Sequence, residues 1–430
     1  MSRTQRQKNS GSPAPKPVEQ VSLSAKHLTL RILLLVLAVG VAAAAFTFAF
    51  RELVHGNDGW QTVTASSAAL PACGGDLTLR YYFGSTEESA RSEMRSVTEI
   101  YTEACERVFR LYDAGQQYDG VYNLAYLNAH PNEEVPVEDV LYETFALLNR
   151  YDSRYAFLAP LIPEYTNLFS SSDDTVAAEF DPGRNQTVAE LFRQICRYVR
   201  SGAISVRLNE EAHTACLAVS EDYLAFAKEN GITAFLDLWW MQGAFSVDYI
   251  ARTLTEKGYP NGYLSSAEGF SSTLGQTGTL TASVFDHEGN RRCEVAQVSF
   301  EGPVHSVYLH ARPDNETDRN YRYAYADGSV TTAYLSTADG CSRAALPDLL
   351  SYSGTKGCAE ILLQILPLYA AERVDETALT NLSDDSIQSV WCRERVICYT
   401  DPTATLSQIY SNDTVSYRAR RMSTSPNTGN

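Results

Sequence analysis

Apolar residues along this chain follow two different periods. They recur at helical spacing over residues 87–112, 137–151 and 187–199, which predicts three amphipathic helices. From about Ala203 onward, apolar and polar residues alternate in short runs, which is typical of strands with one buried face. The combination predicts an α+β fold, a single mixed α/β domain over residues 76–412.

The second half of that domain is expected to be mostly sheet. A buried run at 233–240 predicts a strand that leads directly into a helix, and Gly258 is the expected end of that helix. A further apolar helix is expected within 354–372. The alternating runs that predict strands are NGYLSS at 261–266, LTASVFD at 280–286, EVAQVSF at 294–300, HSVYLHA at 305–311 and SVWCRERVICYT at 389–400.

The longest apolar run comes earlier, at residues 32–50. It holds 19 consecutive uncharged residues, close to the ~20 that a transmembrane helix needs. Basic residues precede it, which places the N-terminus in the cytoplasm and the large domain outside the membrane. We therefore expect a single-pass protein of the bacterial cell membrane, with 1–31 as a disordered basic tail, 51–75 as a linker and 413–430 as a disordered tail. The alanines at 42–45 leave a second interpretation open, a cleaved signal peptide.

Charge is distributed unevenly between these parts. The formal net charge is −17, and because residues 1–31 carry +5, the remainder carries −22. A surface this acidic repels phosphate backbones. Nucleic acid is therefore not an expected partner.

The cysteines also follow the apolar run. All nine lie on the side expected to be exported, where disulfides persist, and the odd number leaves at least one without a partner within the chain. The chain has no Cys-x-x-Cys pair and no Cys/His group at metal-ligand spacing. Spacing alone therefore predicts no metal site.

Candidate chemistry is concentrated after the buried run at 233–240. Asp237 ends the expected strand, and Asp248 lies in the helix that follows, so both carboxylates could face one pocket near a helix N-terminus, where anionic ligands are favoured. Trp239 and Trp240, however, fill the turn where a phosphate-binding loop needs glycine. A plainer interpretation stays open, in which one carboxylate favours the helix dipole and the tryptophans belong to the core.

Several of these segments resemble the ApbE-type flavin transferases, which split FAD and attach FMN to a Thr or Ser of a target flavoprotein with the help of a divalent metal. DLWWMQGAFSVD at 237–248 aligns with the family's D-L-G-G-I-A-K-G-x-x-x-D. VYNLAYLNA at 121–129 resembles S-x-L-x-x-L-N-A and keeps Asn128, and NGYLSSAEGF places Glu268 near the acid of S-x-G-G-D/N. The resemblance also covers the segment around Phe157 and Pro163, and it extends over nearly the whole expected domain.

The resemblance implies a fold, cofactors and partners. It implies an ApbE-like fold, FAD and Mg²⁺ as cofactors, and FAD or an exported flavoprotein as partner. It implies Asp237, Asp248 and Glu268 as cofactor-binding residues. It assigns no catalytic residue.

Departures from the family pattern fall at its functional positions. Trp239, Trp240 and Gly243 replace two glycines and a lysine, Leu158 replaces the aspartate of G-x-F-D, and no histidine remains within 321–332. In the late helix, the family binds metal through an aspartate and a threonine four residues later. Cys358 and Leu362 stand at these positions here, so the metal ligands are expected to be lost; Glu360 and Gln364 offer either a substitute pair or an exposed polar pair.

Three hypotheses follow. The first is a catalytically degenerate ApbE-like protein, a pseudoenzyme that acts outside the membrane as a ligand-binding or scaffold module. The second is an active Mg²⁺-dependent FMN transferase for exported flavoproteins, in which Asp237, Asp248, Glu268 and Glu360 rebuild the site. The third is a structural cell-surface protein whose pocket is filled by aromatic residues, which are Trp239, Trp240, Tyr321, Tyr323 and Tyr325. The shape of the cleft distinguishes them. An open cleft ringed by the acids favours the second hypothesis, an open cleft without a metal site favours the first, and a cleft filled by the aromatic residues favours the third.

Overall fold

A computed structural model of the chain describes residues 59–84, 86, 89–275, 278–288, 291–311 and 321–423. The expected cytoplasmic tail and transmembrane segment lie outside these residues. Within the described part of the chain, no helix is both long enough and apolar enough to cross a membrane.

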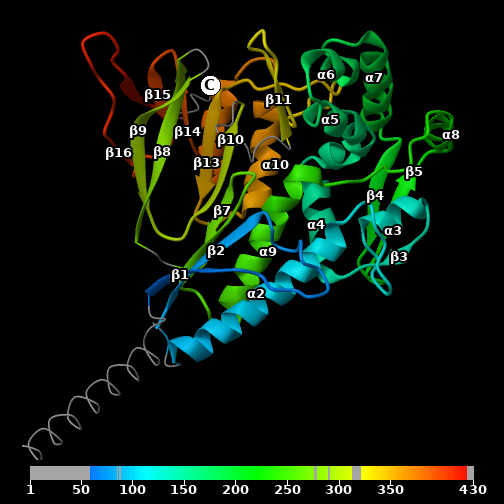
Figure 1. The fold of residues 1–430 in the computed structure, drawn as a ribbon, viewed down its shortest axis with the longest axis horizontal. Coiled ribbons are helices and arrows are strands. Elements are labelled where there is room, and N and C mark those ends of the chain that lie inside the picture. The colour runs from blue at the N-terminus through cyan, green and yellow to red at the C-terminus, as the bar shows by residue number, and fades with distance from the viewer. Residues whose placement is uncertain are drawn as a thin grey trace, which may run out of the picture. The chain divides into compact units, whose positions relative to one another are not determined.

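The centre of the domain is a nine-stranded sheet (Figure 1). Neighbouring strands pair antiparallel, except β15 and β17, which pair parallel. In spatial order the strands are β1 (Gly59–Val63), β2 (Leu77–Phe83), β6 (Gly262–Ser266), β7 (Phe270–Thr273), β10 (His305–His310), β13 (Asp348–Ser353), β14 (Gln388–Arg393), β15 (Val396–Tyr399) and β17 (Arg418–Arg421).

Helices cover one face of this sheet, and a small sheet covers part of the other (Figure 1). α9 (Gln242–Glu256) and α10 (Cys358–Tyr369) pack on the central strands, and α2 (Ala90–Tyr112) packs on α9. Alternate residues of β13 therefore enter different cores: Leu349 faces the helices, and Leu350 faces the small sheet. That small sheet consists of β16 (Thr405–Ser407), β9 (Arg291–Glu301) and β8 (Thr279–Glu288).

The remaining elements lie mainly between α2 and α9 in sequence. The helices are α3 (Leu124–Ala129), α4 (Asp139–Arg150), α5 (Ile162–Phe169), α6 (Asp174–Phe180), α7 (Gln186–Arg200), α8 (Glu221–Glu229) and, near the C-terminus, α11 (Glu376–Asn381). The short strands are β3 (Val135–Pro136), β4 (Ile204–Asn209) and β5 (Thr214–Val219), with β11 (Arg322–Ala324) and β12 (Val330–Thr332) as a separate pair. The predicted helices and most predicted strands are present.

Three predictions of local structure are wrong. Residues 59–63, expected in a linker, form β1, and residues 418–421, expected in a disordered tail, form β17. Both strands are edge strands, which the sheet orders through backbone pairing despite their polar composition. The run at 233–240 forms no strand; its last two residues and Met241 form a 3₁₀ turn, Trp239–Met241, that leads into α9.

Candidate functional site

The Asn128 side chain bonds to the backbone of the segment before α9, as a neighbouring strand would. Its side-chain oxygen accepts hydrogen bonds from the backbone N–H groups of Phe235 and Leu236, both at 2.9 Å, and its Nδ2 donates to the Leu236 carbonyl at 2.8 Å. A buried backbone must satisfy its polar groups, and here one side chain does so. The Asp237 N–H donates to the Ala156 carbonyl at 2.9 Å. The segment that leads to the turn is therefore fixed without belonging to a sheet.

Asp237 holds that turn closed. Its Oδ1 accepts a hydrogen bond from the Trp239 backbone N–H at 2.7 Å. Trp239 has φ +49°, in the left-handed region that favours glycine. Burial raises the pKa of Asp237 to about 6, which the Trp239 N–H partly offsets. The carboxylate is thus occupied by its own turn.

The two tryptophans fill the space beside this turn. Trp240 is buried, stacks on Phe270 with ring centroids 6.0 Å apart, and donates from Nε1 to the Ala333 carbonyl at 3.2 Å. Trp239 stacks on Phe169 at 6.2 Å and meets Tyr321 edge-on at 5.9 Å. Two small cavities remain around them, with volumes of about 30 and 20 Å³.

Glu268 lines the first of these cavities with Trp240 and Tyr321, and Asp237 lines the second with both tryptophans. Burial raises the pKa of Tyr321, and the carboxylates of Glu268 and Asp237 raise it further. Two of the three predicted cofactor-binding acids are therefore brought to the same aromatic cluster. Asp248 lines neither cavity.

One carboxyl oxygen of Glu268 is buried without a hydrogen bond. Its Oε2 is buried and has no hydrogen-bond partner in the described structure. Burial raises the pKa of Glu268 to about 7. A Cβ added at Gly243 of α9 would lie 2.7 Å from Oε2. The residue that stands at the family's lysine position therefore lets this carboxyl pack directly against the helix.

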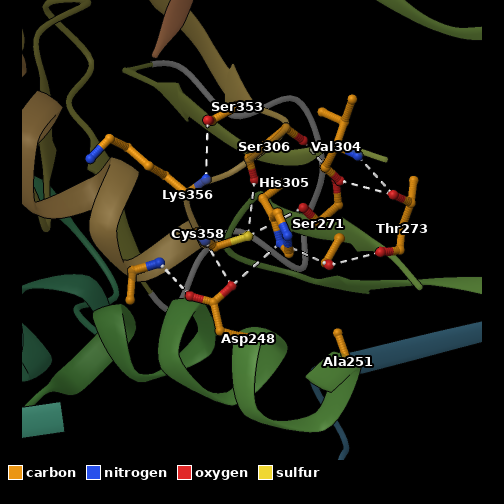
Figure 2. Close-up of polar contacts among 12 residues, drawn as sticks. Asp248, Ala251, Ser271, Thr273, Val304, His305, Ser306, Ser353, Lys356 and Cys358 are labelled. Carbon is orange, nitrogen blue, oxygen red and sulfur yellow. Dashed lines mark hydrogen bonds and ion pairs between the residues drawn. The ribbon is translucent and has the colours of Figure 1, made fainter. Parts of the chain in front are cut away.

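Asp248 belongs to a different place, the junction of α9 and α10 (Figure 2). Its two carboxylate oxygens accept hydrogen bonds from the backbone N–H groups of Cys358 at 2.7 Å and Ala359 at 2.9 Å. These N–H groups have no partner within α10, since they belong to its first turn. The interpretation of Asp248 as a carboxylate at the N-terminus of its own helix is wrong, because Asp248 is the seventh residue of α9 and its carboxylate caps α10 instead.

His305 completes this cluster. Its Nδ1 lies 3.7 Å from Asp248 Oδ1 and 2.9 Å from Ser272 Oγ. One ligand atom each of Asp248, His305 and Cys358 lies within 4.8 Å of the others. More than fifty residues separate each member from the next along the chain, so residue spacing carried no signal for the cluster.

The residues at the family's metal positions do not fit Mg²⁺, which prefers oxygen ligands. Cys358 is fully buried, and its thiol donates to the carbonyls of Ser271 at 3.2 Å and Ser306 at 3.6 Å. Burial raises its pKa well above the ordinary thiol value. Leu362 is buried and apolar.

Both members of the expected substitute pair, Glu360 and Gln364, make local contacts. Glu360 accepts a hydrogen bond from Lys356 Nζ at 2.5 Å and another from the Tyr151 hydroxyl. Gln364 donates to the Glu360 carbonyl at 3.4 Å. Lys356 and Tyr151 lower the pKa of the Glu360 carboxyl, although its burial opposes them. Glu360 therefore forms a local ion pair.

Comparisons with solved structures find a similar fold in two ApbE proteins. The ApbE protein of Thermotoga maritima matches with a TM-score of 0.52 and 10% identity, over 77% of this chain and 94% of that one. The flavin transferase ApbE of Vibrio cholerae matches with a TM-score of 0.50 and 9% identity, over 77% of this chain and 92% of that one. No protein-family model matches the sequence, and no curated protein matches it. The chain has an ApbE-like fold.

Proposed function

We propose that this chain is a membrane-anchored extracytoplasmic structural protein, which uses the ApbE-like fold as a scaffold, has no flavin site and does not transfer FMN. The observation that carries the proposal is the filled turn after Asp237, where Trp239 and Trp240 occupy the positions of two glycines in the family pattern. The anchor is the apolar run at 32–50.

The volume left at the turn supports this proposal. Pockets for cofactor-sized ligands have volumes of about 300–1,000 Å³. The cavities lined by Glu268 and by Asp237 have volumes of about 30 and 20 Å³. Admitting a flavin would require displacing Trp240, which is buried and stacked on Phe270.

The available charges also support it. Cleaving a pyrophosphate requires a metal ion or cations that stabilise the charge developing on the phosphates. Cys358 and Leu362 do not provide hard ligands, and Lys356 is paired with Glu360. Fold alone carries no activity, so these losses favour a scaffold over a transferase.

The decisive experiment measures FAD binding and FMN transfer on the full-length chain purified in detergent. We expect no heat of binding with FAD and Mg²⁺ at ~1 mM, a concentration that detects interactions as weak as about −4 kcal/mol. We also expect no mass increase of a flavin-acceptor peptide. The Vibrio cholerae ApbE under the same conditions is the positive control.

A matched variant tests whether Trp239 and Trp240 are what prevents FAD binding. Replacing both tryptophans with the family's glycines, in Trp239→Gly/Trp240→Gly, removes the side chains that fill the turn.

FMN transfer by the unmodified chain would overturn the proposal and support the active-transferase hypothesis. FAD binding without transfer would instead indicate a flavin-holding module.

The location is tested separately. A membrane-impermeant protease added to intact spheroplasts is expected to digest the domain at residues 76–412. Protection of the domain, with digestion only after lysis, would contradict the extracytoplasmic assignment.

A further inference from the structure

Three side chains with different metal-binding atoms meet at the α9–α10 junction (Figure 2). Asp248 comes from α9, His305 from the first residue of β10, and Cys358 from the first residue of α10. One carboxylate oxygen, one imidazole nitrogen and one sulfur lie within 4.8 Å of one another. We propose that Asp248, His305 and Cys358 bind a zinc-type divalent ion.

The spacing fits a tetrahedral ion. Bonds of ~2.0–2.3 Å to nitrogen, oxygen and sulfur place tetrahedral ligands about 3.3–3.8 Å from one another. Asp248 Oδ1 and His305 Nδ1 are 3.7 Å apart. The sulfur of Cys358 lies at most 4.8 Å from these two atoms. It therefore needs to move toward them by no more than about 1 Å to reach the tetrahedral spacing.

The chemistry of the donors selects the ion. Thiolate and imidazole favour Zn²⁺ and similar ions, whereas Mg²⁺ takes oxygen ligands. The resemblance to the ApbE family implies Mg²⁺ and therefore does not predict a zinc-type site here. Three protein ligands leave a fourth position for water or another small donor.

Backbone groups hold one of the ligands in place. The backbone N–H groups of Cys358 and Ala359 fix the Asp248 carboxylate. Partners of this kind orient metal ligands. The Ser272 hydroxyl contacts His305 Nδ1 in the metal-free protein, and metal binding through Nδ1 replaces that contact.

Capping of α10 by Asp248 explains only part of the arrangement. It accounts for the carboxylate and the backbone of Cys358. It does not account for the imidazole of His305 beside them.

Cys358 must lose its proton for the sulfur to bind. In the metal-free protein the S–H group faces the Ser271 and Ser306 carbonyl oxygens, which disfavour a bare thiolate. When the ion binds, the S–H bond breaks, the proton passes to solvent and an S–metal bond forms. Asp248 and His305 are 26% and 27% exposed, so the ion reaches the cluster from their side.

The test uses the full-length chain in detergent, stripped with a chelator and then titrated with ZnCl₂ or CoCl₂ in excess MgCl₂. We expect one Zn²⁺ per chain by elemental analysis. We also expect the near-ultraviolet thiolate-to-Co²⁺ charge-transfer band, which requires a cysteine ligand. Neither readout depends on FAD, so the result stands apart from the test of FMN transfer.

Two ligand variants and two controls make the result specific. Cys358→Ser and His305→Gln are each expected to weaken Zn²⁺ binding at least ~10-fold, and Cys358→Ser to abolish the charge-transfer band. Cys293→Ser and His213→Gln lie outside the cluster and are expected to leave affinity unchanged. Circular dichroism confirms that each variant is folded.

Two outcomes would overturn the proposal. One is the absence of stoichiometric Zn²⁺ in the folded unmodified chain. The other is Zn²⁺ binding that both folded ligand variants retain at full affinity. If Cys358→Ser does not fold, His305→Gln decides, because among the described residues the partly exposed His305 ring makes one side-chain hydrogen bond, to Ser272, and one ion pair, with Asp248.

Discussion

Trp239 combines a backbone conformation that favours glycine with a large, packed side chain. The backbone there has φ +49°, and the aligned family position is glycine. Trp239 adopts this left-handed conformation with an indole side chain that stacks on Phe169. The side chain at this turn therefore packs in the space beside the backbone.

This conformation predicts an unusual order of stabilities at Trp239. We expect Trp239→Gly to be more stable than Trp239→Ala by ~1 kcal/mol, because only glycine adopts φ > 0 without steric cost. Urea unfolding of the two variants measures the difference.

The same pair of substitutions at Trp240 is the control. Trp240 is not among the residues with positive φ, so glycine there should be less stable than alanine by about 0.5–1 kcal/mol. An identical order at both positions would contradict the argument from backbone conformation.

At the scale of elements, α9 and α10 are joined by one carboxylate. Asp248 satisfies two N–H groups at the start of α10, and a Cβ at Gly357 would lie 2.4 Å from its Oδ2. Gly357 has φ −70°, so its backbone would accept any residue. Glycine is required there by the close approach of the two helices.

We therefore expect Gly357→Ala to lower the free energy of unfolding by about 1–3 kcal/mol, since the added methyl must displace Asp248. Gly354→Ala is the matched control, because its Cβ would meet only the Pro303 carbonyl, at 3.4 Å. Chemical denaturation of both variants gives the comparison. Equal midpoints would show that the junction adapts without cost.

On the scale of the whole molecule, an acidic protein contains two carboxyls that burial keeps partly protonated. The net charge is −17, and burial raises the pKa of Glu268 to about 7 and of Asp237 to about 6. Both lie in the aromatic cluster around Trp240. Their ionisation therefore places negative charge inside an already acidic domain.

This arrangement predicts that stability falls as pH rises. The unfolded chain releases the Glu268 proton near pH 4.5, whereas the folded protein retains it to about pH 7. Within that window the folded state binds more protons, so the stability contributed by Glu268 is full below about pH 4.5 and is lost as pH passes 7. We expect a loss on the order of 1–3 kcal/mol.

Glu268→Gln isolates this contribution, because it removes the titration while keeping the shape of the side chain. Its unfolding free energy, measured from pH 4.5 to 8, is expected to decline less steeply than that of the unmodified chain. Parallel curves would mean that general charge repulsion, and not Glu268, sets the pH dependence.

The order of elements followed from local patterns. Helical spacing predicted α2, α4, α7, α9 and α10, and alternation predicted the β8–β9 pair and β10. β13 was not predicted because all six of its residues are buried, so its sequence has no alternation of apolar and polar residues. β1 and β17 were not predicted because edge strands are held by pairing and not by an apolar pattern.

By itself, the sequence determined the periodicity, the acidic charge and the tryptophans at positions where the resembling family has glycine. Each of these is a property of neighbouring residues. Only the tertiary structure decided which residues meet. It placed Asp237 and Glu268 around Trp240. It also placed Asp248 with His305 and Cys358, because α10 packs against both α9 and β10 and so brings together side chains that are more than fifty residues apart.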